Sequence, residues 1–287
     1  MKKILVTDCG GSSCGWMAVD AGAVRHSFVT AGFNAAVTGD DAVALSVAEA
    51  AARLSEEGFA PDEIHFYGAG CGTPAACGRV SGILRGYFPD ADAEVESDLV
   101  GAARATLGDS AGVACILGTG ANAGLFAGGR LCRRIPPLGY VLGDEGSGAY
   151  LGKQLLVKVL RGELPADIVK AFTEETGVDE AAAIERVYRS PGANAFLGSL
   201  AGFLSAHIDV PQLEEIVTDA FRAFRRTFVE PYLREESDNR APLKIGVVGS
   251  VGAVFGKQLR SVFPETEVNV VRYPLEAMAL YHCRGEA

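Results

Sequence analysis

Apolar runs that end in glycine turns occur three times along this chain. The first run, at residues 4–6, leads through Asp8 into a glycine turn and then into a second apolar run. The same order of run, turn and run is found at residues 113–126. These two patterns predict β-hairpins. The third run, at residues 245–248, ends in a glycine turn that passes into helical spacing, which predicts a strand followed by a helix.

Between the first two hairpins the pattern alternates between helix and strand. Apolar positions keep a helical period over residues 40–58, and short apolar strands are expected at residues 64–67 and 93–96. A capped helix is expected at residues 97–108, with serine before it and glycine at its end. Because this order restarts at Val113, the sequence predicts an α/β protein built from two related units.

The second unit is expected to contain additional helices between its strands. Amphipathic spacing predicts them at residues 147–161, 165–176, 179–189 and 211–233. The phenylalanines of the last helix form a stripe that is typical of core packing. A polar loop is expected at residues 235–242, before the third glycine-turn strand.

This order of elements sets the expected domain boundaries. An N-terminal domain is expected at residues 1–108, and a C-terminal domain with helical insertions at residues 109–273. Residues 274–287 are expected to form a closing helix that packs back on the N-terminal domain.

Charge and composition narrow the range of partners. The chain has 26 Lys and Arg against 36 Asp and Glu, a formal net charge of −10, which argues against nucleic acid or an anionic membrane as partner. No apolar run reaches the roughly 18 residues that a membrane span needs. The seven cysteines are an odd number, and several lie in apolar strands (Cys115) or in small-residue turns (Cys9, Cys14), so free thiols are expected rather than disulfides. We therefore expect a cytoplasmic protein.

Two of the glycine turns are candidates for phosphate binding. Glycines let the backbone approach a phosphate, and successive N–H groups in such a turn form a concavity that binds anions. The turn at residues 10–12 follows Asp8, whose carboxylate can hold Mg²⁺ beside phosphates. The turn at residues 118–120 repeats the design. An ordinary hairpin turn needs no ligand, so both interpretations stay open for each turn alone.

Acidic and amide side chains suggest a site for a second substrate. Asp98 is expected in the first turn of a helix capped by Ser97, where the helix dipole favours the ionised form. It could act as a base for a hydroxyl group, or it could only support the helix start. Asp144 and Glu145 lie in a glycine-rich segment that suits sugar hydroxyls or a capping loop. The amide of Asn34 could bind a hydroxyl or close an Asx-turn.

These motifs together resemble one known family. The matching segments are Asp8-Cys9-Gly10-Gly11-Ser12, Gly32-Phe33-Asn34, Tyr67-Gly68-Ala69-Gly70-Cys71, Ser97-Asp98, Gly118-Thr119-Gly120, Pro137-Leu138-Gly139-Tyr140 and Gly143-Asp144-Glu145-Gly146-Ser147-Gly148. They resemble the N-acetylglucosamine kinase family, in the bacterial branch grouped with the BadF/BadG/BcrA/BcrD-type ATPases. This family belongs to the actin/hexokinase/heat-shock ATPase superfamily. The resemblance implies two ribonuclease-H-like (actin-like ATPase) domains around a central nucleotide and sugar cleft.

The resemblance also implies a reaction and a role for each matching position. The reaction would be ATP-dependent, Mg²⁺-requiring phosphorylation of an N-acetyl amino sugar, with N-acetylglucosamine giving its 6-phosphate, in a homodimer. Asp8 would hold Mg²⁺, and Asp98 would be the catalytic base for the 6-hydroxyl. The ATP-binding positions would be Gly10, Gly11, Ser12, Gly118, Thr119, Gly120, Gly249 and Ser250, the last two near the adenosine. The sugar-binding positions would be Asn34, Asp98, Gly139 and Asp144.

Two positions depart from the family pattern and keep other functions open. Ser12-Ser13-Cys14 stands where relatives commonly have Thr-Lys-Thr, which removes a cation near the phosphates, and Leu138 stands where some members have an aromatic residue. One alternative is a catalytically weak, sugar-sensing protein of the same fold. Another is an ATP-dependent activator of 2-hydroxyacyl-CoA dehydratases, which would need exposed thiolates for a [4Fe–4S] cluster. N-acetylmuramate, N-acetylmannosamine and glucosamine are the alternative sugars.

Overall fold

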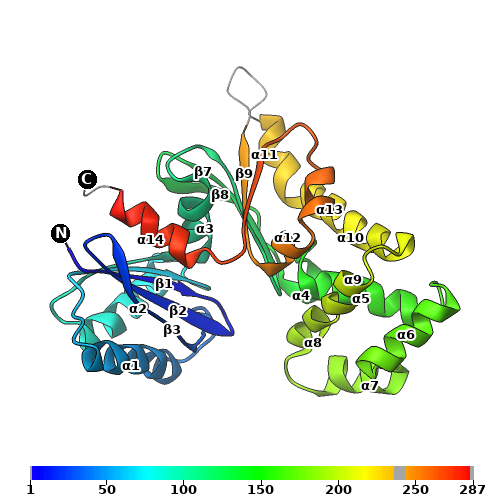
Figure 1. Ribbon diagram of the computed structural model, residues 1–287, viewed down its shortest axis with the longest axis horizontal. Helices are drawn as coiled ribbons and strands as arrows, with labels where there is room; N and C mark the ends of the chain where they lie inside the picture. The colour runs from blue at the N-terminus through cyan, green and yellow to red at the C-terminus, as the bar shows by residue number, and fades with distance from the viewer. Residues whose placement is uncertain (1, 236–242, 285–287) are drawn as a thin grey trace. The chain divides into compact units, whose positions relative to one another are not determined.

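The chain forms two compact units, each built on its own sheet (Figure 1). The computed structural model describes residues 2–235 and 243–284. The first unit combines Met1–Asp109 with Tyr273–Ala287, and the second is Ser110–Arg272. Most of the polar loop expected at residues 235–242 lies outside the described residues.

Both sheets have five strands in the same order. The first sheet runs β3-β2-β1-β4-β5 and the second β8-β7-β6-β9-β10. In the first unit the strands are β1 (Ile4–Cys9), β2 (Ser13–Asp20), β3 (Ala23–Ala31), β4 (Glu63–Gly68) and β5 (Asp92–Ser97). In the second they are β6 (Gly112–Leu117), β7 (Ala121–Ala127), β8 (Arg130–Arg134), β9 (Lys244–Val248) and β10 (Val268–Val271). The α/β fold class with two related sheets, expected from the restart at Val113, is confirmed.

The central strand of each sheet, β1 or β6, has one antiparallel and one parallel neighbour. It pairs antiparallel with the strand that follows it and parallel with the fourth strand of its unit. A glycine turn connects each antiparallel pair, so these are the hairpins that the apolar pattern predicts. The fourth and fifth strands of each unit are also parallel, which places three carboxyl ends at the same edge of each sheet.

Helices cover both faces of the first sheet. They are α1 (Asp40–Glu56), α2 (Pro74–Tyr87), α3 (Asp98–Leu107) and α14 (Leu275–Cys283). Side chains alternate between the two faces of β4, and Ile64 and Phe66 share a buried cluster with Val47 of α1 and Leu84 of α2. The opposite face of the first sheet is covered by α3 and α14, and Figure 1 shows α14 across the sheet from α1.

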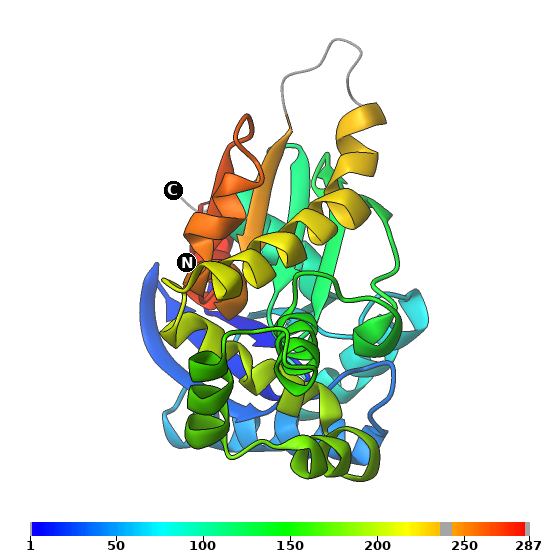
Figure 2. The ribbon, with the colours of Figure 1, turned by 90° about the vertical axis from the view of Figure 1, so that its right-hand side faces the viewer.

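The second unit has a longer series of helices. They are α4 (Gly139–Leu142), α5 (Gly148–Leu160), α6 (Ala166–Thr176), α7 (Glu180–Ile184), η1 (Glu185–Arg189), α8 (Ala193–Ser199), α9 (Ala201–Ala206), α10 (Pro211–Phe224), η2 (Arg225–Val229), α11 (Glu230–Glu235), α12 (Ser250–Val254) and α13 (Gly256–Ser261). Figure 2 shows α10 lying across the sheet of this unit. The phenylalanine stripe expected for the core is fully buried at Phe221, Phe224 and Phe228. Within the described ranges, no helix is both long and apolar enough to cross a bilayer.

A polar network connects α14 to the sheet of the first unit. The Tyr67 hydroxyl on β4 lies 2.6 Å from His282 Nε2 on α14 and 2.6 Å from Arg104 Nη1 on α3. The rings of His282 and His65 stack with their centroids 3.5 Å apart. Burial, helped by the nearby charges of His65 and Arg104, lowers the pKa of His282 to about 3. Hydrogen bonds from His65 and Arg104 lower the pKa of Glu94 to about 2.

We expect this network to make the protein less stable in acid. Unfolded His282 takes up a proton below pH 6.5, whereas the folded side chain stays neutral down to about pH 3. The free energy of unfolding therefore falls as the pH drops through that window, and Glu94 adds a second fall between pH 4.5 and about 2. One full proton corresponds to about 1.4 kcal/mol per pH unit, and the partial exposure of His282 reduces its share to about half of that.

Urea unfolding at several pH values measures this effect. The substitution His282→Gln should flatten the decline in unfolding free energy between pH 6.5 and 4.5, because it removes the titrating ring. His26→Gln is the matched control, because His26 is an imidazole of the same unit that lies on β3, outside the network. Equal slopes for the wild type and His282→Gln would contradict this account.

Candidate functional site

The candidate residues of the first unit lie at one edge of its sheet. β1, β4 and β5 run parallel; Asp8 lies at the carboxyl end of β1, and Asp98 directly follows β5. The amide of Ala69, just after β4, donates to the carbonyl of Cys9 at 2.8 Å, and the amide of Ala35 donates to the carbonyl of Ala69 at 2.8 Å. These bonds join the segments that follow β1, β3 and β4. The structure therefore brings Asp8 and Asp98 to the same edge.

The first glycine turn is closed and closely packed on one side. The Gly10 amide donates to the Ser13 carbonyl at 2.9 Å, and residues 10–12 are exposed. A Cβ at Gly32 would lie 2.2 Å from the Ser13 nitrogen and 2.3 Å from the Gly10 oxygen, so only glycine allows the segment after β3 to lie on this turn. The exposed tip of residues 10–12 is the part of the turn that a phosphate can reach.

Asp8 is the candidate metal ligand of the first unit. Its side chain is largely buried, and this burial raises its pKa to about 6. Among the described residues, none forms a hydrogen bond or an ion pair with its carboxylate. No group of three or more His, Cys, Asp or Glu in those residues is arranged to hold a metal, so an ion here would take most of its ligands from water and substrate. That ligand set is the one Mg²⁺ prefers, and Asp8 fits it.

Asn34 uses part of its side chain to shape the local turn. Its Oδ1 accepts from the Ala36 amide at 2.9 Å, which is the Asx-turn geometry. Gly70, at φ +81°, lies so close that a Cβ there would be 2.2 Å from the same oxygen. Of the two interpretations left open for Asn34, the structure contains the Asx-turn. The amide NH₂ group of Asn34 takes no part in this turn and is the group we assign to a bound hydroxyl.

Asp98 is the first residue of α3. The Ser97 hydroxyl caps the helix by accepting from the Val100 amide at 3.4 Å, and Asp98 Oδ1 accepts from the Leu99 amide at 2.8 Å. The carboxylate thus supports the helix start. Asp98 also lies near the buried thiol of Cys71, whose pKa is raised to about 12 mainly by burial.

The second glycine turn is bonded to the start of α5. The Gly118 amide donates to the Gly120 carbonyl at 3.0 Å, which closes the turn. The first two amides of α5 donate to the same turn, Gly148 to the Gly118 carbonyl at 2.8 Å and Ala149 to the Thr119 carbonyl at 3.1 Å. The backbone of this turn is therefore fixed from two sides.

The third glycine turn lies directly on the second. Gly249 has φ +115°, and a Cβ there would lie 2.4 Å from the Leu117 oxygen and 3.3 Å from the Gly118 nitrogen. Ser250 begins α12 and is exposed. The structure thus brings residues 118–120 and residues 249–250, predicted separately as ATP-binding turns, to the same edge of the second sheet.

Asp144 also belongs to this edge of the second unit. It is 8% exposed, has φ +58°, and its Oδ2 lies 3.1 Å from where a Cβ of Gly120 would be. Burial raises its pKa, although hydrogen bonds from the backbone of Ala121 and Gly139 act in the opposite direction. The same segment holds exposed Leu138 at φ +64°. Two non-glycine residues in the left-handed region mark strained backbone, which is frequent at functional sites.

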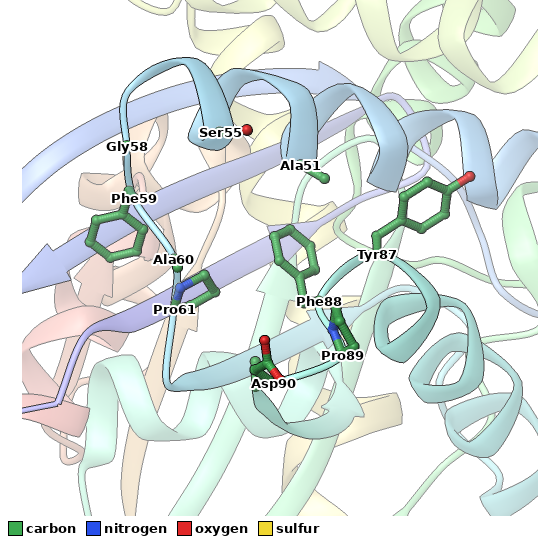
Figure 3. Close-up of a pocket in the computed structure, with 11 residues that line it drawn as sticks. Ala51, Ser55, Gly58, Phe59, Ala60, Pro61, Tyr87, Phe88, Pro89 and Asp90 are labelled. Atoms are coloured by element: carbon green, nitrogen blue, oxygen red, sulfur yellow. The ribbon is translucent and has the colours of Figure 1, made fainter.

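A pocket in the first unit lies away from these residues (Figure 3). It has a volume of about 390 Å³, and its lining includes Phe59, Pro61, Phe88 and Pro89. These residues precede β4 and β5, so the pocket is at the amino ends of those strands, whereas Asp8 and Asp98 are at the carboxyl edge. It is therefore separate from the candidate site.

The polar network of Tyr67, Arg104 and His282 was not predicted from the sequence. Tyr67 begins one of the matching motifs, but it is 215 positions from His282, and no local pattern connects the two. The closeness of Gly32 to residues 10–13 was missed for the same reason, since a glycine in a turn does not reveal what packs against it.

Comparisons with known proteins identify several solved structures. No protein-family model and no curated protein matches this chain. A candidate N-acetylglucosamine kinase from Porphyromonas gingivalis is 35% identical, with a TM-score of 0.89 over 99% of this chain and 100% of that chain. A second from Chromobacterium violaceum is 18% identical, with a TM-score of 0.75 over 98% and 99%. A ROK hexokinase from Thermus thermophilus is 18% identical, with a TM-score of 0.52 over 97% and 96%; these last two likenesses are of fold.

Proposed function

Because this chain belongs to the N-acetylglucosamine kinase family of the actin-like ATPase superfamily, we propose that it transfers the terminal phosphoryl group of ATP to an N-acetyl amino sugar. The preferred acceptor is N-acetylglucosamine, and the product is its 6-phosphate. One observation carries the proposal: at the carboxyl edge of the parallel strands of each sheet, a glycine packs on other backbone too closely for a side chain, at Gly32 and Gly70 in the first unit and at Gly249 in the second. Gly32 packs on the turn at residues 10–13, which follows the acidic residue Asp8.

The glycine turns are the proposed binding site for ATP. The turn at Gly10, Gly11 and Ser12 contacts the outer phosphates. Gly118, Thr119 and Gly120 form the second phosphate turn, and Gly249 and Ser250 lie near the adenosine. The exposure of residues 10–12 and the close packing of Gly249 on Leu117 support these assignments. Rigid turns suit this role, because backbone amides that are already oriented need no reorganisation when the anion binds.

Asp8 is the proposed ligand of Mg²⁺. A divalent cation offsets the charge of the phosphates during transfer. The support is the Asp8 carboxylate, which is largely buried and whose pKa is raised by that burial.

The acceptor sugar is proposed to bind next to Asp98. As the 6-oxygen attacks the terminal phosphorus, its proton passes to the Asp98 carboxylate, the bond to the bridging oxygen breaks, and ADP leaves. The amide NH₂ of Asn34, the Gly139 backbone and the Asp144 carboxylate are assigned to the other sugar hydroxyls. The position of Asp98 supports this role, because it directly follows β5 and lies at the same edge of the sheet as Asp8.

One observation favours a second function, that of a sugar sensor with little turnover. Ser13 stands where relatives commonly carry a lysine, so one cation near the phosphates is missing. The activator of 2-hydroxyacyl-CoA dehydratases has weaker support, because Cys132 is the one exposed cysteine in the part of the chain that the structure describes. The family resemblance also leads us to propose a homodimer.

The proposal is tested by measuring ADP release and sugar phosphate with Mg²⁺ and ATP across four acceptors. These are N-acetylglucosamine, N-acetylmuramate, N-acetylmannosamine and glucosamine, with reactions lacking acceptor or Mg²⁺ as controls. We expect N-acetylglucosamine to give a 6-phosphate with the highest kcat/KM, and no product without Mg²⁺. Binding of sugar and ATP without product would instead support the sensor, and product from another acceptor alone would reassign the substrate.

A further inference from the structure

In the polar network between β4, α3 and α14, the donor and the acceptor of each hydrogen bond can be assigned. Arg104 carries only donors, so its Nη1 donates to the Tyr67 oxygen. The single proton of the Tyr67 hydroxyl is then directed at His282 Nε2, 2.6 Å away. His282 therefore accepts at Nε2 and carries its own proton at Nδ1. The three side chains form a donor chain that runs from α3 through Tyr67 to α14.

Neighbouring side chains hold this donor chain in place. The His65 ring stacks on His282 at an interplanar angle of 11°, and Tyr281 meets the His282 ring edge-on at 90°. Glu94 accepts from Arg104 Nη2 at 3.1 Å and lies 3.0 Å from His65 Nδ1. Since the rings cannot rotate freely, a side chain at position 282 without an acceptor leaves the Tyr67 proton without its partner.

The helix that carries His282 is also packed against the helix that begins with Asp98. A Cβ at Gly101 of α3 would lie 2.6 Å from Met278 Cε on α14 and 2.7 Å from Tyr67 Cγ. Only glycine allows the two helices and the tyrosine to approach this closely. Gly101 is about one turn beyond Asp98, so α14 contacts α3 close to the proposed base.

The start of α14 contacts the element that carries Asp8. Leu275 Cδ2 lies 3.1 Å from where a Cβ of Gly15 would be, and Gly15 pairs with Asp8 in the register of β1 and β2. One helix therefore packs on both elements that supply the acidic residues of the proposed site.

We propose that Tyr67 and His282 are positioning residues for Asp98, because the donor chain from Arg104 through Tyr67 to His282 holds α3 and α14 against β4. Arg104 and Asp98 lie on the same continuous ten-residue helix, so a shift of α3 at Arg104 is expected to displace Asp98 at its first residue. A misplacement of about 1 Å can cost a reaction about 10²-fold. The positioning role rests on the proposed function, in which Asp98 is the base.

Two substitutions break the donor chain in different ways. Tyr67→Phe removes the hydroxyl and keeps the ring, and His282→Leu removes the acceptor. We expect each to lower kcat by about tenfold or more, with the KM for ATP changed less than about twofold. His282→Gln places an acceptor near the position of Nε2 and should restore kcat to near the wild-type value. Tyr87→Phe is the control, because it removes a more exposed hydroxyl from α2 of the same unit.

Amide hydrogen exchange at residues 99–101 is the second measurement, and it does not depend on activity. We expect exchange there to be about tenfold faster in Tyr67→Phe and His282→Leu than in the wild type and His282→Gln. A folded Tyr67→Phe protein with wild-type exchange at these residues overturns the positioning role, whatever its activity. If the wild type phosphorylates no sugar, the proposed function fails, and the exchange result alone decides whether the donor chain holds α3.

Discussion

Replacing Asp98 by Asn is expected to lower kcat by about 10²–10⁴-fold while the sugar still binds. Asparagine keeps the size of the side chain and an oxygen that can accept from the Leu99 amide, so the start of α3 should stay intact. It cannot take a proton from the 6-hydroxyl, and the attacking oxygen then loses its base. Steady-state ADP release gives kcat, and calorimetric titration with the sugar gives the binding constant.

Asp167→Asn is the matched control for this experiment. Asp167 is an exposed carboxylate in the first turn of α6, so its substitution makes the same change of charge at a helix start outside the proposed site. It should leave kcat within about twofold of the wild-type value, as expected of a surface substitution. Wild-type turnover in Asp98→Asn would show that Asp98 only supports its helix, and a loss of sugar binding would assign it to recognition rather than proton transfer.

Replacing Gly249 by Ala is expected to destabilise the protein by about 3 kcal/mol or more and to abolish ATP binding. Backbone at φ +115° is strained for any side chain, which costs about 1–3 kcal/mol. The added Cβ would also lie 2.4 Å from the Leu117 oxygen, so the backbone itself must move. That movement displaces the turn at residues 118–120, on which the proposed phosphate contacts depend. Urea unfolding and ATP titration measure the two effects.

Gly177→Ala is the control that separates the cost of positive φ from the cost of the steric clash at Gly249. Gly177 also has positive φ, at +67°, but a Cβ there meets no atom within 4 Å. Its substitution should cost only about 1–2 kcal/mol and leave ATP binding unchanged. If Gly249→Ala and Gly177→Ala lowered the unfolding free energy equally, the close approach of Gly249 to Leu117 would contribute nothing to the loss of stability.

Local pattern was sufficient to predict most of the strands and most of the helices, but β8 (Arg130–Arg134) and β10 (Val268–Val271) were not predicted. The apolar runs of β1, β6 and β9 and the serine cap of α3 depend on residues a few positions apart, so they can be read without the fold. The helix expected at residues 211–233 is one run in the structure, but its hydrogen bonding changes at Arg225–Val229 to a π-helical turn. α8 and α9 are six or seven residues long, too short for a helical period to stand out.

Less of the candidate site could be predicted from the sequence, because the site depends on contacts between segments that are distant along the chain. The sequence marked Asn34 as a possible ligand, but only the structure places its Oδ1 against the Ala36 amide and beside Gly70. Asp144 was assigned to sugar hydroxyls from its glycine-rich surroundings, and the structure adds that its carboxylate lies against the turn containing Gly120. Whether these residues bind sugar stays a prediction.

The division of the chain has a consequence for its synthesis. The second unit is a continuous stretch, Ser110–Arg272, whereas the first needs Tyr273–Ala287 as well as Met1–Asp109. The codons for the whole second unit are translated before those for α14. Until then Gly101 and Tyr67 lack Met278 and His282 as neighbours. The unit that starts first is thus the last to finish folding, and nascent chains halted near residue 272 should expose this uncovered face to chaperones.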